Sequence, residues 1–310
     1  INKDREYYRD MVNKTNGLLL PGGGRNIMNS YYRDAAEILF DYAMEANDRG
    51  EYYPIWGECM GFQIITVLMI KKYAHNTNHT DNWLANCNAE DMAVNLDFKS
   101  YPSQTRLFAN ADKNIINILK TQNVTPNYHH NCMTPKNFTE SKLTNYFRII
   151  TTSKDADDLE FISTYESLNK SRPIYALQWH PEKIPFEFIV IKGGKLPQEN
   201  IPHNYKAILI AQFMANFFVN ETRKNHHHFT NTAEENEYII YKYNPKFTQE
   251  EDKGEHFSQM YYFYFDKDNA NQTKLPVKLI LIIIITIIVI IGIVILVLFI
   301  KYRRCCRKST

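Results

Sequence analysis

Residues 56–61 read Trp-Gly-Glu-Cys-Met-Gly and place Cys59 between two apolar stretches. Residues 53–56 predict a short buried strand, and residues 60–69 carry apolar side chains at helical spacing. A cysteine on a sharp strand-to-helix turn with small neighbours has the arrangement of a nucleophile elbow. The helix dipole favours the thiolate there, and free backbone N–H groups can stabilise an oxyanion. Taken by itself the pattern is weak, because a single cysteine is more often a buried structural residue.

The same order of elements occurs earlier in the chain. Residues 17–21, Gly-Leu-Leu-Leu-Pro, predict a strand that ends in Gly22-Gly23-Gly24, and residues 32–46 show helical spacing of apolar side chains. Strands that alternate with helices indicate a parallel sheet. We therefore expect an α/β fold with a doubly wound, mostly parallel sheet.

The rest of the chain gives a coarser pattern. Residues 159–164 and 173–179 predict two strands, and residues 205–219 predict an amphipathic helix. Residues 72–136 are rich in Asn, His and Thr and have weak periodicity, so we expect loops and short strands there.

A second motif, Gln178-Trp-His-Pro-Glu-Lys183, places a histidine and a carboxylate just after a predicted strand. Cys59, His180 and Glu182 can form a triad in which His180 takes the thiol proton and later protonates the leaving amine. Glu182 would hold the imidazole in its tautomer and orientation. A lone histidine at a strand end is more often a surface residue, so the interpretation depends on its pairing with the elbow.

Three blocks together resemble the signatures of class I glutamine amidotransferase-like proteins, which have a flavodoxin-like fold. The blocks are Pro21-Gly-Gly, Trp56-Gly-Glu-Cys-Met-Gly-Phe62 and Gln178-Trp-His-Pro-Glu-Lys183, in the family's order. Within that superfamily the chain is similar to gamma-glutamyl hydrolases in its segments 16–23, 161–164, 217–221 and 226–229. The resemblance covers about residues 4–265.

The resemblance implies hydrolysis of gamma-glutamyl amide bonds, typically in folylpoly-gamma-glutamates, through a thioester on Cys59 that water then cleaves. It implies that backbone N–H groups of Gly23 and Met60 form the oxyanion hole. Neither metal nor cofactor is implied. The small-molecule substrate is the expected partner, and a homodimer is compatible with the family.

The resemblance also suggests substrate-binding residues. The family's second functional histidine matches His129, for which the alternative is an exposed loop histidine. Gly22 and Gln63 are further substrate-site candidates, although the family often has Glu where this chain has Gln63. Family members begin with roughly two more strand-helix units, so we interpret the sequence as N-terminally incomplete, with strands of the sheet missing.

Residues 279–300 contain only Leu, Ile, Val and Phe apart from Thr286 and Gly292, and are long enough to cross a bilayer as a helix. Five basic residues in 301–310 place the C-terminus in the cytosol. We expect a single-pass type I protein: a catalytic domain over 1–266, a linker over 267–278, the span and a basic tail. The catalytic domain would be lumenal or extracellular, in the lysosome or vacuole or at the cell surface. A buried core helix is the alternative, but residues 279–300 lack the polar face that soluble helices of this length show.

Cysteines and glycosylation motifs fit that orientation. Cys87 and Cys132 are candidates for one disulfide, which would leave Cys59 free, and Cys305 and Cys306 lie where acylation occurs. Asn-X-Ser/Thr motifs provide weak support because the chain is rich in Asn. These motifs begin at Asn13, Asn78, Asn123, Asn137, Asn169, Asn220 and Asn271.

Charge and composition exclude other functions. The net charge is +2, and five positive charges lie in the tail, so the remainder is negative and no basic surface for nucleic acid is expected. His226, His227 and His228 are consecutive and cannot all point at one metal ion from a regular helix or strand. Two alternatives remain: a glutamine amidotransferase subunit, and an inactive membrane glycoprotein that binds gamma-glutamyl ligands.

Overall fold

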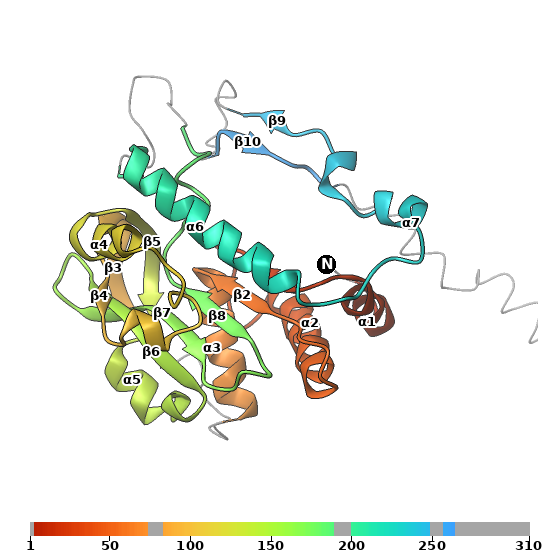
Figure 1. The fold of residues 1–310 in the computed structure, drawn as a ribbon, viewed down its shortest axis with the longest axis horizontal. Helices are drawn as coiled ribbons and strands as arrows, with labels where there is room; N and C mark the ends of the chain where they lie inside the picture. The colour runs from red at the N-terminus through yellow and green to blue at the C-terminus, as the bar shows by residue number, and fades with distance from the viewer. Residues whose placement is uncertain (1–2, 74–82, 189–199, 249–256, 264–310) are drawn as a thin grey trace, which may run out of the picture. The chain divides into compact units, whose positions relative to one another are not determined.

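The computed structural model describes residues 3–73, 83–188, 200–248 and 257–263. Contacts divide the chain into two units, Ile1–Met260 and Tyr261–Thr310. The predicted boundaries at residues 266, 278 and 300 fall outside the described ranges and stay predictions. The helices and strands that position the predicted site all belong to the first unit (Figure 1).

The first unit is built on a six-stranded sheet. Its strands, in spatial order, are β1 (Leu18–Leu20), β2 (Ile55–Glu58), β8 (Ile174–Leu177), β7 (Glu160–Ser167), β6 (Phe147–Lys154) and β4 (Asp97–Phe98). The pairs β1–β2 and β2–β8 are parallel, and the remaining pairs of the sheet are antiparallel. One half of the sheet is therefore parallel and the other half antiparallel.

The prediction of a mostly parallel sheet is wrong, and short connections explain why. Residues 155–159 join β6 to β7, and residues 168–173 join β7 to β8. A parallel neighbour needs a crossover of a dozen or more residues, whereas antiparallel strands can be joined by a short turn. The α/β class with helices on both faces is retained.

Helices cover both faces of the sheet (Figure 1). Along β2, Ile55 packs into one apolar core with α2 (Tyr31–Asp48) and α3 (Met60–Lys72). The next residue, Trp56, packs into a second core with α4 (Lys113–Thr121) and α6 (Tyr205–Thr222). Successive side chains of a strand point to opposite faces, so this alternation follows from the strand itself.

The helices begin at polar capping residues whose side-chain oxygens accept a backbone N–H of the first turn. The caps are Asp4 for α1 (Arg5–Lys14), Ser30 for α2, Asp112 for α4, Thr134 for α5 (Pro135–Glu140), Asn204 for α6 and Asn231 for α7 (Thr232–Asn236). Helix α3 differs, because its N-cap is Cys59 and no side chain caps it.

The middle of the chain is more regular than predicted. Residues 72–136 contain the helix α4 and two long antiparallel strands, β3 (Ala85–Val94) and β5 (Thr125–Cys132). A disulfide joins Cys87 on β3 to Cys132 on β5, as predicted. Two register shifts interrupt the β3–β5 pairing, which accounts for the weak periodicity of this stretch. The short strands β9 (Lys246–Phe247) and β10 (Gln259–Met260) form another antiparallel pair.

No helix in the described part of the chain is long and apolar enough to span a bilayer. The predicted span at residues 279–300 lies outside the described residues, as do Cys305 and Cys306.

Candidate active site

Cys59 lies at the turn between β2 and α3, as the elbow prediction requires. Its backbone has φ +46° and ψ −102°, and its N–H donates to the Leu177 carbonyl at 2.8 Å. Glycines make the tight turn feasible. A Cβ on Gly57 would lie 2.8 Å from the Gly61 backbone, and a Cβ on Gly61 would lie 2.0 Å from the Leu20 carbonyl oxygen.

The structure brings Cys59, His180 and the Pro21-Gly-Gly loop together. A Cβ built on Gly22 would lie 2.7 Å from Cε1 of His180 and 3.5 Å from Cβ of Cys59. All three segments follow the carboxyl ends of the adjacent parallel strands β1, β2 and β8. Nδ1 of His180 lies 2.6 Å from Oε1 of Glu182, the predicted orienting contact.

The electrostatics of this cluster favour an imidazolium. Burial lowers the pKa of His180, but the Glu182 carboxylate and the interactions with Cys59 outweigh burial and raise that pKa from 6.5 to about 10. Partial burial raises the pKa of Glu182, but the positive charge of His180 outweighs it and lowers that pKa below its usual range. Nε2 of His180 is buried and, within the described ranges, has no hydrogen-bond partner apart from its interaction with Cys59.

The predicted oxyanion donors lie beside the nucleophile. Met60 is the first residue of α3, where a backbone N–H has no partner within the helix. Gly23 lies against it, because a Cβ there would be 2.7 Å from Cε of Met60. The arrangement offers N–H groups from two elements next to Cys59.

His129 lies on β5 with its side chain buried, not in an exposed loop. Its Nε2 is 3.2 Å from Oδ1 of Asn127, and its ring meets Phe161 edge-on at 5.0 Å between centroids. Burial, and then the positive charge of His180, lower the pKa of His129 to about 3. The imidazole is therefore neutral near His180.

Comparison with known proteins identifies the family of this site. The sequence model of Peptidase C26 matches residues 1–182. Gamma-glutamyl hydrolase of Rattus norvegicus is 38% identical over 242 residues, which are 78% of this chain and 70% of the relative. The chain belongs to the peptidase C26 family of gamma-glutamyl hydrolases. The family predicted from the three motifs is confirmed.

Other relatives carry the same name across distant organisms. Gamma-glutamyl hydrolase B of Dictyostelium discoideum is 34% identical over 84% of this chain and 70% of its own length. Gamma-glutamyl hydrolase of Homo sapiens is 34% identical over 78% and 70%. Among solved structures, the Trypanosoma brucei CTPS glutaminase domain with bound acivicin gives a TM-score of 0.44 at 13% identity, over 71% of this chain and 76% of that chain.

Gln63, where other gamma-glutamyl hydrolases were expected to carry Glu, lies in the first turns of α3 with its side chain buried. Its amide nitrogen donates to the Asn131 carbonyl at 2.8 Å. This bond ties α3 to β5, the strand that carries His129, so the contact helps to fix the histidine relative to the elbow.

Sequence reasoning missed Glu58, the residue before the nucleophile. Its side chain is buried, and Nε1 of Trp56 donates to its Oε1 at 2.8 Å. It also missed Tyr32, which donates from its hydroxyl to the Pro21 carbonyl at 2.8 Å. Burial, and then the charges of Glu58 and Cys59, raise the pKa of this phenol. A carboxylate beside a nucleophile, at the end of an otherwise apolar strand, was the available signal for Glu58.

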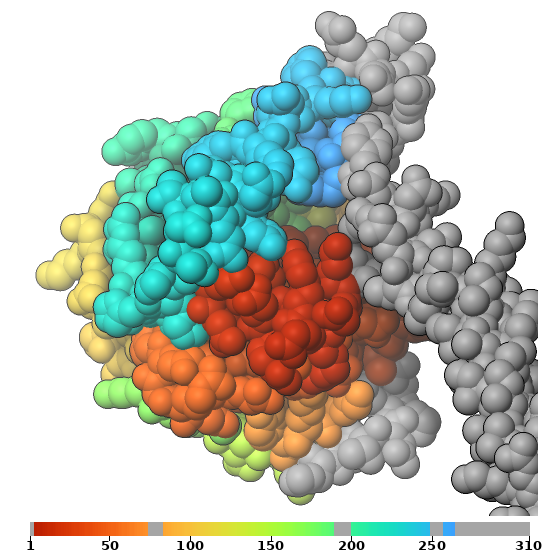
Figure 2. Space-filling view, turned by 90° about the vertical axis from the view of Figure 1, so that its right-hand side faces the viewer, coloured from red at the N-terminus to blue at the C-terminus, as the bar shows by residue number. Residues whose placement is uncertain are grey.

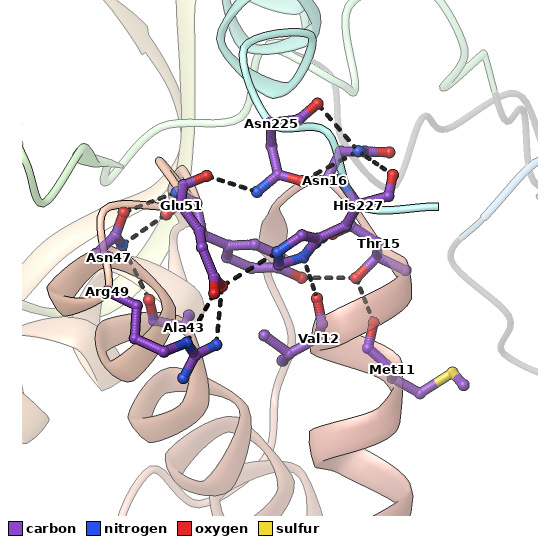
Figure 3. A network of polar contacts seen from close by, with 11 residues as sticks. Met11, Val12, Thr15, Asn16, Ala43, Asn47, Arg49, Glu51, Asn225 and His227 are labelled. Carbon is purple, nitrogen blue, oxygen red and sulfur yellow. Dashed lines mark hydrogen bonds and ion pairs between the residues drawn. The ribbon is translucent and has the colours of Figure 1, made fainter. Parts of the chain in front are cut away.

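The histidine run contributes to structure. Each ring nitrogen of His227 has an oxygen partner. Nδ1 lies 2.7 Å from the Val12 carbonyl, and Nε2 lies 3.1 Å from Oε2 of Glu51 (Figure 3). Asn16 donates to the His227 carbonyl at 2.7 Å. The segment after α6 therefore packs against α1, as the surface view shows (Figure 2). Within the described ranges no group of three or more His, Cys, Asp or Glu side chains is placed to hold a metal ion.

The glycosylation motifs differ in accessibility. Asn13, Asn123, Asn169 and Asn220 are exposed, whereas Asn137 is half-buried and donates to the Trp83 carbonyl at 2.8 Å. Asn78 and Asn271 lie outside the described residues. Four asparagines therefore present an accessible side chain, and glycosylation of them stays a prediction.

Proposed function

We propose that this gamma-glutamyl hydrolase family member cleaves gamma-glutamyl amide bonds with Cys59 as the nucleophile and His180 as the acid and base. The observation that carries the proposal is the meeting of three strand ends at one point. There Cys59 lies beside His180, and Glu182 is 2.6 Å from the far nitrogen of the same imidazole. The intact triad favours catalysis over the inactive, ligand-binding alternative.

The proposed reaction proceeds in two steps. The Cys59 thiolate attacks the gamma-carbonyl carbon, and the oxyanion is stabilised by the N–H groups of Gly23 and Met60. The C–N bond then breaks, and the His180 imidazolium gives its proton to the leaving amine. This leaves a gamma-glutamyl thioester on Cys59. Water then attacks the thioester while His180 takes a proton from it. The C–S bond breaks, the gamma-carboxylic acid is released, and the Cys59 thiolate and the His180 imidazolium are regenerated.

The substrate that we propose is a poly-gamma-glutamyl folate or a related gamma-glutamyl conjugate. Three relatives named gamma-glutamyl hydrolase, and the three sequence blocks, support this class. A glutamine amidotransferase would need a synthase partner to receive ammonia, and the apolar stretch 279–300 and the glycosylation motifs argue against that second reaction.

The test uses the full chain and its Cys59→Ala variant with pteroylpentaglutamate at acidic and at neutral pH. We expect the wild-type protein to release glutamate or short gamma-glutamyl peptides, and the variant to release none above background. Circular dichroism of both proteins controls for folding. Absence of release from a folded wild-type protein would contradict the proposal and favour the ligand-binding homologue.

We also propose that a membrane holds the enzyme with its catalytic unit in the lumen or outside the cell. The support is the uncharged apolar stretch 279–300, the Cys87–Cys132 disulfide and the exposed glycosylation motifs. In eukaryotic cells the full chain should resist alkaline carbonate extraction, and an endoglycosidase should increase its mobility. Extraction into the carbonate supernatant would refute the anchor, and unchanged mobility would refute lumenal exposure.

A further inference from the structure

Glu58 is the last residue of β2 and directly precedes the nucleophile. Its side chain points to the same face as Trp56, as expected for residues two apart on a strand. Nε1 of Trp56 donates to Oε1 of Glu58 at 2.8 Å. The Glu58 carboxyl lies close enough to the carboxyl of Glu182 for the two groups to interact. Interactions therefore link Trp56 through Glu58 and Glu182 to His180.

Two carboxyl groups in contact cannot both be ionised without strong repulsion. Burial and the nearby charge of Glu182 raise the pKa of Glu58 to about 8. The positive charge of His180 lowers the pKa of Glu182. At neutral pH the proton therefore stays on Glu58, and the negative charge stays on Glu182.

The hydrogen-bond directions follow from this assignment. An indole N–H only donates, so Oε1 of Glu58 is the accepting oxygen, and the proton is left on Oε2. That O–H can donate to the Glu182 carboxylate, whose Oε1 accepts from Nδ1 of His180. The Glu182 side chain is 44% exposed, so without a second contact water would compete for its orientation.

Resting on the proposed hydrolase function, we propose that Glu58 is a positioning residue whose protonated carboxyl holds the Glu182 carboxylate against His180. Glu58 does not touch the substrate. It acts through Glu182, which in turn fixes the tautomer and orientation of the imidazole. Trp56 and Glu58 thereby extend the Cys59 site by two residues.

The charged and titratable groups around Glu58 come from three segments. Glu182 and His180 follow β8, Cys59 follows β2, and Tyr32 comes from α2. Burial, and then the charges of Glu58 and Cys59, raise the pKa of Tyr32 above its usual 10, so this phenol stays neutral. Near pH 8 Glu58 is therefore the group that changes charge, and its ionisation places a second carboxylate against Glu182.

The experiment compares the full chain with Glu58→Gln and Glu58→Ala variants. The amide of Gln can accept from Trp56 and donate to Glu182 at every pH, whereas Ala does neither. We expect the wild-type kcat to fall above pH 8, and this fall to be absent in the Gln variant up to the titration of His180 near 10. The Ala variant should lose about 10- to 100-fold in kcat at pH 7, with KM little changed.

Glu140→Gln is the matched control, because it removes a carboxylate whose side chain is 54% exposed on α5. It should keep the wild-type profile. A Gln variant with the same alkaline fall as the wild type would overturn the proposal, as would wild-type kcat in a folded Ala variant. If the Ala variant does not fold, the pH profile of the Gln variant decides.

A second readout separates this proposal from the proposed function. The rate at which iodoacetamide alkylates Cys59, followed by mass spectrometry of its peptide, reports the thiol and imidazole without any substrate. An altered alkaline profile in Glu58→Gln supports the positioning role even if no gamma-glutamyl substrate is cleaved. Identical profiles in all variants, together with normal hydrolysis, refute the role of Glu58 and leave the hydrolase intact.

Discussion

Cys59 has a backbone φ of +46°, in the left-handed region that residues with a Cβ rarely use. Such a conformation costs about 1–3 kcal/mol and persists only when the surrounding structure holds it. Here the Cys59 N–H donates to Leu177 at 2.8 Å, and its carbonyl accepts from the Gln63 N–H at 3.0 Å. Backbone hydrogen bonds on both sides of Cys59 therefore hold this strained conformation, which sets the direction of the thiol. Its Sγ lies 3.8 Å from the Tyr128 carbonyl.

The same crowding makes Gly22→Ala a specific test of the site. Its new Cβ would lie 2.7 Å from Cε1 of His180, so the imidazole must move while the fold has no reason to change. We expect kcat/KM to fall by about 100-fold or more, with the unfolding midpoint close to that of the wild type. Gly24→Ala is the control, because its Cβ meets nothing within 4 Å. Equal activity of the two variants would contradict the proposed geometry.

The candidate residues that could be predicted belong to short contiguous motifs. Cys59, His180 and Glu182 each carry a side chain of known chemistry beside a predicted strand end, so sequence was sufficient. Glu58 could not be assigned, because its chemistry comes from burial and from contact with Glu182, a residue far away in sequence. Roles that depend on long-range contacts are not visible in a local pattern.

Helix α3 is buried on every side from Met60 to Ile70. It contacts β1, β2 and β8. The helix therefore has no polar face, and its position depends on close packing rather than on amphipathic burial. Gly61 is the point of closest approach, because a Cβ there would lie 2.0 Å from the Leu20 carbonyl oxygen.

We therefore expect Gly61→Ala to destabilise the protein strongly. In an exposed helix this change usually stabilises by about 0.5–1 kcal/mol, because Gly is the poorer helix former. Here the methyl group would push α3 away from β1, and an overpacked core typically loses about 1–3 kcal/mol. Urea unfolding of Gly61→Ala and of the wild type measures the sign of the change in the free energy of unfolding. A more stable variant would show that the close approach is not real.

Elements with strong local signals were predicted well, and elements defined by their partners were not. The helix over residues 205–219 and the strand at residues 17–21 match α6 and β1. Strand β6 was missed, and the antiparallel pairing of β7 was not predicted, because strand direction is set by connection length and by pairing. The helix α4 was hidden in an Asn-rich segment, where Ile115, Ile118 and Leu119 form only a short apolar stripe.

At the scale of the molecule, the site depends on only half of the sheet. The three motif loops follow β1, β2 and β8, which are adjacent and parallel, so their carboxyl ends meet at one edge. The antiparallel half lies beyond β8 and contributes none of the three loops. This explains why the three motifs meet in the structure although the sheet as a whole was not predicted.

The proposed positioning role and the folding stability both depend on the proton that Glu58 keeps. Below pH 4.5 Glu58 is protonated in both the folded and the unfolded chain. Between pH 4.5 and 8 the unfolded chain releases this proton but the folded chain keeps it, because burial raises the folded pKa to about 8. The folded state binds the proton more tightly, so its stability falls as pH rises through this window, by at most about 1.4 kcal/mol per pH unit.

Glu58→Gln removes that proton linkage and should therefore gain stability over the wild type as pH rises from 4.5 to 8, with no further gain above. Urea unfolding of both proteins at pH 4.5, 6, 8 and 9 measures the difference. The titration of His180 is present in both proteins, so it cancels to first order. A difference that does not change with pH would mean that Glu58 is already ionised in the folded protein. A growing difference would mean that the buried acid beside the nucleophile is kept at the expense of stability, as is common for groups that serve a reaction.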